Sequence, residues 1–476
     1  MRLAALLLAL LAAQPGPLAA DPQAVLQGAV RRELDDGARP EVLAALARRL
    51  AGGIETPALP PAPALPEAAP RVETGEIQAA LTQLSILVGG NGQLALQRAQ
   101  GGRSDVVQIL SGTARLADLA ASDLIQRKGQ VWHLTRPLVV WPGAALALSP
   151  SEVLELDTKS GAFILGFGAV TLDGATIRGD AGQNATVPEF RPFVLIAGQG
   201  ALRADRAAFQ DLGFPGPPPV QGLSVLTAGL LQPLFPTALT SSRITRVHGL
   251  AFEGTDGLIL TGNRVTSAGG AAIRVADARD VTLTGNRIAD TEDGAGLRLS
   301  GRLSTVQVSG NRVLSGGGNG VQIDGITTGL TLAANVVTGN DGAGIVLGPS
   351  ACVTIHGNIV SDNRTSGLRL AGASHARVTD NAIHRNGSAG IELRDRSGRA
   401  PVVLADNVLA GNREGLRAAG LGEIHLTGND LSDQIPRQFA GDFTPWLGPY
   451  LTAGEALVIP AALGTPPGTD VPCKTE

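Results

Sequence analysis

Aromatic residues are scarce in this sequence of 476 residues, which contains one Tyr, three Trp and ten Phe. Most of the apolar residues, which make up 43% of the chain, are therefore Ala, Val, Leu and Ile. Such small and branched side chains favour a core of closely stacked β-strands. The single tyrosine also disfavours a site that holds neutral sugars by ring stacking.

An excess of positive charge is absent too: 38 Lys and Arg residues stand against 42 Asp and Glu, a net charge of -4. No dense basic run with interleaved aromatics occurs, which argues against nucleic acid as a partner. The sequence contains no Cys/His cluster or carboxylate group at metal-ligand spacing, and no glycine loop of the kind that binds phosphate. We therefore predict neither a metal nor a cofactor.

Long apolar runs are missing except at the start of the chain. Arg2 precedes the apolar run Leu3–Ala13, and the small pair Ala19 and Ala20 follows, which is the pattern of a secretory signal peptide. No later run reaches the length of about 18 residues that a membrane span needs. We predict a signal peptide over residues 1–20, export to the periplasm and no membrane span.

The chain has only two cysteines, Cys352 within the repeats described below and Cys473 near the C-terminus. Export to an oxidising compartment permits a disulfide. Because one cysteine lies in a repeat and the other in the tail, we predict instead a buried free thiol at Cys352 and a mobile Cys473.

A Gly-Asn motif, or a close variant of it, recurs through the second half of the sequence. Its asparagines follow at steps of 22 to 26 residues: Asn263, Asn286, Asn311, Asn335, Asn358, Asn381, Asn407 and Asn429. A period near 24 residues indicates one unit stacked on itself. Each unit holds an alternating stretch such as GLRLSG or GVQIDG and two further short apolar stretches, which predicts three short strands per coil. The predicted fold class is all-β, a right-handed parallel β-helix with a small helical N-terminal region.

Stacked coils place equivalent asparagines about 4.8 Å apart, close enough for each side-chain amide to bond the next. A buried amide without a partner costs about 1–3 kcal/mol, so a repeated asparagine stabilises the stack only as part of a ladder. A second set follows five residues later and predicts a second ladder: Asn340, Asn363, Asn386 and Asn412. We assign all of these asparagines to structure rather than to catalysis.

Composition divides the remainder of the chain into segments. Apolar spacing fits two short helices that break near Gly37, and the run TPALPPAPALPEAAP is typical of an extended linker rather than a packed one. The predicted segments are a signal peptide (1–20), a short helical segment (21–54), a Pro/Ala-rich linker (55–70), a mixed entry or capping region (71–130), the β-helix (131–430) and a C-terminal cap and tail (431–476).

The first strand of each coil points alternate residues outward. The outward column is predicted to be Arg274, Arg298, Gln322, Val346, Arg369, Glu392 and Arg417, which we call the arginine strip. Two arginines on adjacent coils, about 5 Å apart, repel by roughly 1 kcal/mol even in water. A solvated surface is the simpler interpretation of any one arginine, but four of them favour a strip that binds an anion. Repeated guanidinium groups suit a linear acidic polymer such as an acidic polysaccharide.

Several stretches together resemble one enzyme family. LTRPLVVWPGAALAL, GAFILGFGAVTLDGATIRG, FRPFVLIAG, DLGFPG and GLSV, with the coils after them, are similar to the periplasmic alginate (mannuronan) C-5 epimerases. The resemblance spans roughly residues 76–430 in the same order, and FRPF is its most specific part. It implies an exported isomerase that converts D-mannuronate to L-guluronate within the polymer, and a place near exopolysaccharide export machinery.

The family's reaction needs a cation to neutralise the uronate carboxylate, a base to remove the C-5 proton, and an acid on the other sugar face. By order and spacing, the family's Asp-Pro-His-Asp motif falls on Arg274, Val275, Ala276 and Asp277, so only the last Asp is present. Asp277 is then a candidate orienting carboxylate, and His248, one coil earlier, is the candidate base. The alternative for both residues is a structural role in a turn.

Arg298 and Arg302 lie near the place where the family keeps its carboxylate-neutralising arginine, and Arg298 is the preferred substrate ligand. The predicted substrate-binding residues are Arg274, Arg298, Arg302, Arg369 and Arg417. Three hypotheses stay open. The protein is an epimerase-type enzyme with an altered acid/base set, a non-catalytic relative that guides acidic polysaccharide through the periplasm, or a polysaccharide lyase, which needs the same base and neutralising cation.

Overall fold

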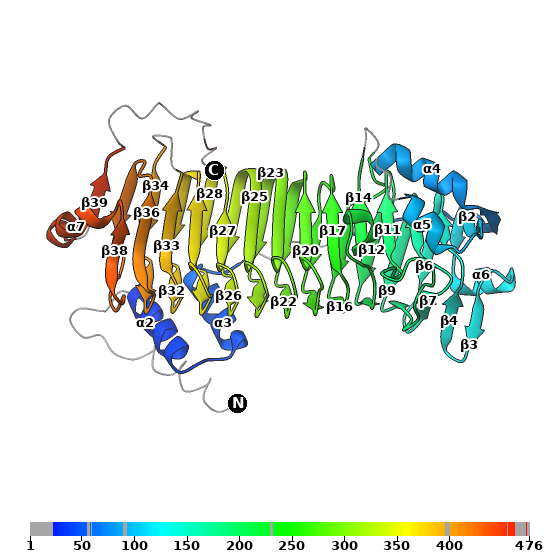
Figure 1. The fold of residues 1–476 in the computed structure, drawn as a ribbon, viewed down its shortest axis with the longest axis horizontal. Coiled ribbons are helices and arrows are strands. Elements are labelled where there is room, and N and C mark those ends of the chain that lie inside the picture. The colour runs from blue at the N-terminus through cyan, green and yellow to red at the C-terminus, as the bar shows by residue number, and fades with distance from the viewer. Residues whose placement is uncertain are drawn as a thin grey trace.

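The computed structural model describes residues 22–54, 58, 60–88, 93–228, 232–395, 400–454, 456–461 and 473. The predicted signal peptide, residues 1–20, lies outside the described residues. The described chain forms a long stack of coils, with helices near its two ends and along one side (Figure 1). The fold is an all-β, right-handed parallel β-helix with a small helical N-terminal region, as predicted.

Each coil contributes one strand to each of three faces, and every face pairs in parallel from coil to coil. The first face contains β5 (Leu138–Val140), β8 (Ile164–Gly166), β11 (Val194–Ala197), β14 (Gly222–Leu226), β17 (Gly249–Glu253), β20 (Ile273–Ala276), β27 (Ile345–Leu347), β30 (Leu368–Ala371), β33 (Ala389–Arg394), β36 (Glu414–Ala419) and β38 (Arg437–Gly441).

The second face contains β6 (Ala144–Leu148), β9 (Ala169–Asp173), β12 (Ala201–Asp205), β15 (Ala238–Thr240), β18 (Ile259–Thr261), β21 (Arg279–Thr284), β28 (Ser350–His356), β31 (Ser374–Thr379), β34 (Val402–Ala405) and β37 (Ile424–Thr427). Three longer strands run through the first and second faces without a break: β2 (Asp105–Ala114), β23 (Leu297–Ser309) and β25 (Val321–Ala333).

The third face contains β4 (Val131–Leu134), β7 (Val153–Leu156), β10 (Thr176–Gly179), β13 (Ala208–Gln210), β16 (Arg243–Thr245), β19 (Arg264–Thr266), β22 (Arg287–Ala289), β24 (Arg312–Leu314), β26 (Val336–Thr338), β29 (Ile359–Ser361), β32 (Ala382–His384) and β35 (Val408–Ala410). Its strands form a separate sheet, which also includes the short β3 (Gln126–Lys128) in a hairpin with β4.

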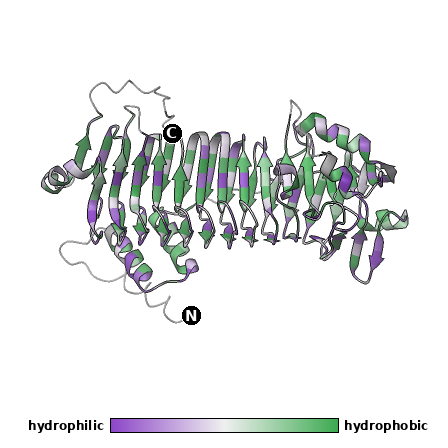
Figure 2. Cartoon of the chain, viewed as in Figure 1, coloured by the Kyte–Doolittle hydropathy of each residue, from purple (hydrophilic) through white to green (hydrophobic). Residues whose placement is uncertain are grey.

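The interior of the stack follows from strand periodicity, because successive side chains point to opposite sides of a strand. In β20, Ile273 and Val275 point inward and are 1% and 0% exposed, while Arg274 between them points outward. The same alternation recurs along the strands as hydrophobic and hydrophilic bands (Figure 2). Small branched residues fill this narrow interior in close layers, which explains why so few aromatic residues are needed.

Both asparagine ladders are present. Asn311 shows the pattern: its side-chain Nδ2 donates to Asn335 Oδ1 at 3.0 Å and to the carbonyl of Leu283 at 2.8 Å, and its backbone N–H also donates to Asn335 Oδ1 at 2.9 Å. Seven such amide-to-amide steps run from Asn263 to Asn429 at 2.9–3.0 Å. The second ladder runs likewise from Asn340 through Asn363 and Asn386 to Asn412. Both predicted ladders are confirmed.

The β-helix begins earlier and ends later than predicted. β2 pairs in parallel with β5 and β6, so the first coil starts at residue 105 rather than 131. At the other end, β38 pairs in parallel with β36 beyond residue 430. The repeat pattern does not reveal the first coil, because β2 is longer than the neighbouring strands and lies within a helix-rich segment. The C-terminal cap consists of η2 (Thr444–Trp446), α7 (Leu447–Ala453) and β39 (Ala456–Ile459), which pairs antiparallel with β37.

Helices cover the outer side of the first face in the early coils. β1 (Arg71–Glu76) pairs antiparallel with β2 and leads into α4 (Ile77–Val88) and α5 (Gln93–Ala99), while α6 (Leu116–Ala121) closes the end of the stack. The outward residues of β5, β8 and β11 are Val139, Leu165 and Leu195, and all three are buried in one cluster with α4. Phe190 and Phe193 of the FRPF stretch are fully buried in the same cluster. The family-like motif therefore serves packing.

The N-terminal segment packs against one side of the later coils. α2 (Pro22–Asp35) and α3 (Pro40–Leu50) bury their apolar residues on the third face, over β22 to β32 (Figure 1). The described part of the linker then runs back along the coils: Arg203 donates to the carbonyls of Pro60 and Pro61 at 2.9 and 2.8 Å, and Thr113 to that of Pro66 at 2.7 Å. The linker is extended, as its prolines dictate, but the expectation that it is unpacked is wrong.

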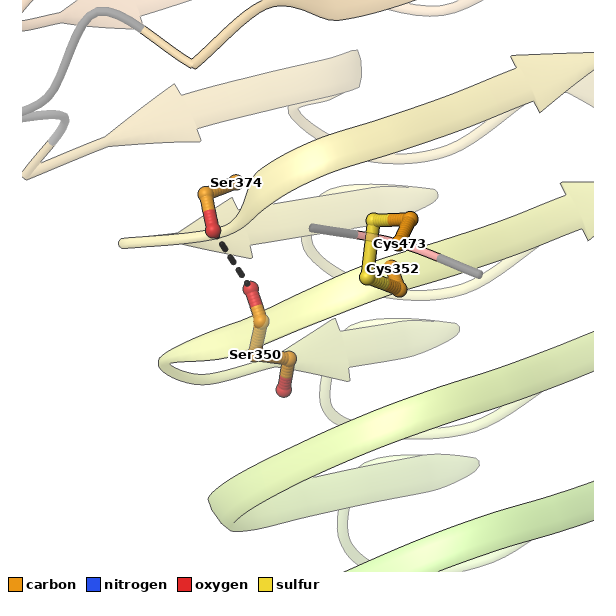
Figure 3. Close-up of a disulfide and its surroundings, with 4 residues drawn as sticks. All are labelled: Ser350, Cys352, Ser374 and Cys473. Carbon is orange, nitrogen blue, oxygen red and sulfur yellow. Dashed lines mark hydrogen bonds between the residues drawn. A yellow bond between two sulfur atoms is a disulfide. The ribbon is translucent and has the colours of Figure 1, made fainter. Parts of the chain in front are cut away.

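Cys352 and Cys473 form a disulfide (Figure 3), which corrects the prediction of a free, buried thiol. Cys352 lies in β28 and is only half-buried. The bond brings Cys473, which is 121 positions later in the chain, to the second face of the stack at β28. Sequence separation gives no indication of this contact.

The central ladder should be the most sensitive part of the stack. Asn335→Leu removes the partner of Asn311 and leaves buried amides without hydrogen-bond partners on both sides. We therefore expect a loss of about 1–3 kcal/mol in the free energy of unfolding. Asn429→Leu, at the partly exposed end of the ladder, should lose less. Urea unfolding of both variants measures the difference, and equal losses would contradict the ladder.

The disulfide should add stability that a reductant removes. In the chain-entropy description, closing a loop of 121 residues contributes up to about 5 kcal/mol. Thermal unfolding of the wild type should shift to lower temperature in dithiothreitol, whereas Cys473→Ser should unfold at that lower temperature with or without it. A wild type unaffected by full reduction would argue against the bond.

Candidate functional site

The arginine strip lies in register on the outer side of the first face. Strand pairing aligns the predicted column coil by coil: Arg274, Arg298, Gln322, Val346, Arg369, Glu392 and Arg417. Ser224 and Ala251 continue the column toward the N-terminal end. Beyond them the column becomes apolar under α4, so the polar part of the face begins where the helical cover ends.

Acidic side chains neutralise most of the positive charge of the arginine strip. The pairs are Arg298 with Asp324 at 3.0 Å, Arg369 with Glu392 at 2.8 Å, and Arg417 with Glu414 at 2.9 Å. Within the part of the chain that the structure describes, Arg274 has no ion pair. The like-charge repulsion that suggested an external anion is therefore largely offset inside the protein. Binding of a polymer along this strip stays a prediction.

Glu392 is the centre of this compensation, since it is only 3% exposed on an otherwise outward column. It accepts hydrogen bonds from Ser366 at 2.7 Å, Arg369 at 2.8 Å and Arg394 at 2.7 Å. Burial by itself would raise the pKa of Glu392, but these hydrogen bonds outweigh burial and hold the pKa below its ordinary value. The carboxylate is ionised and fully paired, which is a structural arrangement.

Asp277 occupies a tight turn directly after β20. Its φ is 49°, its side chain is exposed, and its Oδ1 accepts the backbone N–H of Arg302 at 2.9 Å. The carboxylate lies so close to Gly301 that a Cβ there would come within 2.4 Å of it. Asp277 therefore fixes the turns of two successive coils. Asp277 and Arg302 also line a cavity of about 730 Å³ at the end of the first-face strands.

His248 precedes β17, at the opposite end of the same strands. Its ring lies over Gly269 and Gly270, where an added Cβ would come within 3.0 and 3.1 Å of the ring nitrogens. This close approach explains the paired glycines. Burial lowers the pKa of the His248 imidazole, and the nearby Glu292 and Asp293 only partly oppose it. The ring is therefore neutral at pH 7, and among the described residues neither ring nitrogen has a hydrogen-bond partner.

A cavity of about 620 Å³ opens beside His248, and we call it the His248 pocket. Its charged and polar lining comes from the connections between the third and first faces: Asp180, Gln183, Arg191, Asp211, Arg246, Ser267 and Glu292. Arg246 binds Asp211 through two hydrogen bonds of 2.6 and 2.7 Å, so this pair is internally neutral. Asp180 is held by the backbone N–H groups of Thr158 and Gly182 at 2.9 and 3.1 Å.

Arg191 is available to bind an anion in the His248 pocket, because its guanidinium group is not paired with a carboxylate of the described residues. Its Nη1 donates to the carbonyls of Phe190 at 2.8 Å and Pro188 at 3.3 Å, and no carboxylate pairs with it among the described residues. Sequence reasoning missed Arg191, although it is the one charged residue of FRPF. The buried phenylalanines on either side anchor it, which is the signal that would have indicated a positioned side chain.

The structure separates the two predicted catalytic residues. Leu250 pairs with Ile273, so His248 aligns six positions before Asp277 along the strand direction, a separation of roughly 15–20 Å at 3.3 Å per residue. Asp277 cannot orient or assist His248 over this distance. Arg302 accompanies Asp277, whereas Arg191 and Glu292 accompany His248.

Comparisons with known proteins support the fold. The periplasmic alginate epimerase AlgG has a TM-score of 0.62 and 17% sequence identity, over 81% of this chain and 98% of that chain. A single-site mutant of AlgG gives a TM-score of 0.63 at the same identity and coverage. The resemblance to alginate epimerases is thus confirmed as a shared right-handed β-helix. No curated protein sequence matches this chain.

Residues 237–435, less than half of the chain, match the NosD family, described as periplasmic copper-binding protein. This region contains the coils with the asparagine ladders. Both cysteines are in the disulfide, and the described residues include no group of three His, Cys, Asp or Glu placed to hold a metal. None of the helices in the described ranges is long and apolar enough to cross a membrane.

The ion pairs of the strip should matter for stability. Arg369→Met leaves the buried Glu392 with fewer partners, so we expect a loss of about 1–3 kcal/mol in the free energy of unfolding at pH 7. Arg274→Met, at the arginine without an ion pair, should change stability by about 0.5 kcal/mol or less.

The pH dependence of unfolding tests whether the stability loss of Arg369→Met comes from Glu392 or from a general loss of packing. The pKa of Glu392 is lowered in the folded protein, so its stabilisation is present above its ordinary value of 4.5 and is lost as the pH falls through the folded value. Urea unfolding from pH 7 to pH 3 should show a smaller pH dependence for Arg369→Met than for the wild type. Parallel pH profiles would contradict the assigned role of Glu392.

Proposed function

We propose that this protein is an exported β-helix that acts on an acidic polysaccharide, and that its reaction is C-5 epimerisation of mannuronate residues at the His248 pocket. The observation that carries the proposal is the pairing of a neutral histidine, with free ring nitrogens, and an arginine without an acidic partner in one pocket. The fold shared with AlgG supports the substrate class. Asp277 is assigned to the turn instead.

Arg191 would bind the uronate carboxylate. A guanidinium group offers two parallel N–H donors to a carboxylate and reduces its negative charge. The proton on the neighbouring C-5 then becomes more acidic, because the negative charge that forms on its removal spreads into a neutralised carboxylate. Arg246 is less suited to this role, since Asp211 already occupies its donors.

His248 would remove the C-5 proton. A general base must be unprotonated and able to reach the substrate, and burial keeps the imidazole neutral while its ring borders the cavity. The proton moves to the imidazole, and the C–H electron pair is delocalised toward the carboxylate. Return of a proton from water or an acid on the opposite sugar face completes the inversion. Loss of the C-4 oxygen substituent instead would make the enzyme a lyase.

A non-catalytic role in guiding polysaccharide is the second candidate. It is favoured by the missing histidine of the Asp-Pro-His-Asp motif and by the structural role of Asp277 in its turn. The predicted signal peptide and the disulfide support export to an oxidising compartment such as the periplasm. Contact with exopolysaccharide export machinery is proposed from the family resemblance.

Proton NMR in deuterated water tests the reaction on polymannuronate. The wild type should incorporate deuterium at C-5, and His248→Gln should reduce the rate about 10²–10⁴-fold, the usual contribution of a general base. His356→Gln is the matched control, because His356 is also half-buried with a pKa lowered by burial but does not line the pocket. Asp277→Asn should leave the rate nearly unchanged.

The outcomes discriminate among the hypotheses. Unsaturated chain ends without exchange into intact polymer would indicate a lyase. Binding without any exchange would favour the guiding role. Exchange that survives His248→Gln but collapses in Asp277→Asn would move the active site to the cavity around Asp277.

The pH dependence of exchange should follow the neutral imidazole. Because the pKa of His248 lies below its ordinary value of 6.5, the base stays unprotonated in mildly acidic solution. The exchange rate should fall as the pH drops, with a midpoint below pH 6.5. A midpoint above pH 6.5 would be inconsistent with His248 as the base.

A further inference from the structure

The third face carries a ladder of arginines. Arg243, Arg264, Arg287 and Arg312 are the first residues of β16, β19, β22 and β24, and strand pairing places each directly over the next. Their side chains point outward, because the following residue of each strand, such as Ile244 or Val265, is fully buried inside the coil. Neighbouring strands lie about 4.8 Å apart, so four like charges are stacked at the spacing of the coils.

Little negative charge offsets this ladder. Glu41 of α3 lies 3.3 Å from Arg312 and 3.7 Å from Arg287, and it serves both. Arg243 and Arg264 are exposed and have no acidic partner within the described residues. The arginine strip of the first face differs in this respect, because three of its four arginines pair with acids.

Two further observations concern the arginines of the ladder that lie next to α3. The Nη1 nitrogen of Arg287 is buried, makes no hydrogen bond and lies 3.7 Å from Glu41. Burial lowers the pKa of Arg312, Glu41 opposes this, and the neighbouring Arg287, Arg48 and Arg264 lower it further. Such stacked cations are destabilising unless an anion binds across them.

The column beside the ladder suits a sugar. Thr245 and Thr266 lie two residues after Arg243 and Arg264, on the same side of their strands, with their hydroxyl oxygens 3.4 Å apart. Hydroxyl groups beside guanidinium groups match the alternating hydroxyls and carboxylates of a polyuronate.

We infer that the arginine ladder, centred on Arg243 and Arg264, is a second binding surface that holds a carboxylate-bearing polysaccharide along the long axis of the β-helix. The inference rests on the proposed function for its substrate class. The ladder lies at the start of its third-face strands, whereas the His248 pocket begins at Arg246 and Ser267, directly after the ends of the same strands. The ladder would retain the polymer while the pocket acts on single residues.

The test measures binding of long polymannuronate to the full-length exported protein at several salt concentrations. Arg243→Gln with Arg264→Gln should weaken binding roughly three- to thirtyfold, the effect of losing two exposed charge contacts, and should flatten the salt dependence. Arg364→Gln with Arg377→Gln, two exposed arginines outside the ladder, removes the same charge and should leave affinity unchanged. Thermal unfolding verifies that both double variants are folded.

Conservative replacement distinguishes charge from geometry. Arg243→Lys with Arg264→Lys keeps the charge but loses the planar fork, so we expect affinity between that of the wild type and the glutamine variant. Neutral dextran should not bind. Equal binding of duplex DNA, or of vesicles containing anionic lipid, would overturn the assignment to polysaccharide, and equal losses in both double variants would overturn the ladder itself.

Deuterium exchange on short mannuronate oligomers separates this inference from the proposed reaction. The ladder variant should exchange short oligomers as the wild type does, because only the His248 pocket is needed for them. If His248→Gln abolishes exchange while the ladder variant binds long polymer normally, the ladder inference fails alone. If His248→Gln leaves exchange intact while the ladder variant loses polymer binding, the proposed catalytic site fails and the ladder stands.

Discussion

Every coil of this protein must satisfy its backbone hydrogen bonds with the coils above and below it, and nearly everything else depends on that constraint. No strand is long enough to be stable alone, so each residue is held in register with its equivalents at a spacing of about 4.8 Å. The asparagine ladders are the clearest consequence. Each amide bonds both the next amide and a backbone carbonyl of the preceding coil, as Asn311 does with Asn335 and Leu283, and this fixes the corner at which every coil turns.

Fixed register also multiplies any charge that the sequence repeats. On the first face, three of the four arginines of the strip pair with acids, and the buried Glu392 binds Arg369 and Arg394 at once. On the third face, Arg243 and Arg264 are stacked without such acids, and this difference separates a self-contained surface from one suited to an anionic ligand. In a stack of this kind, the repeated residues are required for folding. Residues that differ from the repeat are therefore the ones available for function.

The candidate site is such a departure. His248 and Arg191 occur in different coils and at the edge of the strands, where connections vary in length without disturbing the register. Gly269 and Gly270 give the imidazole room, and the buried phenylalanines of FRPF position the arginine. The helical cover of α4 and α5 ends just before this edge, so the first polar stretch of the first face lies next to the pocket. Packing elements thus determine where the chemistry is possible.

The sequence by itself determined the β-helix, its period, the inward and outward residues of Arg274 and its equivalents, and the two asparagine ladders, because these depend on local spacing and on coils that repeat it. Only the tertiary structure decided that Cys473 returns to Cys352, that the linker packs along the coils, and that α2 and α3 cover a distant part of the third face. It also placed His248 with Arg191 rather than with Asp277. These contacts join segments far apart in sequence through surfaces that carry no repeat, so their energies depend on packing between non-equivalent residues, which periodicity does not encode.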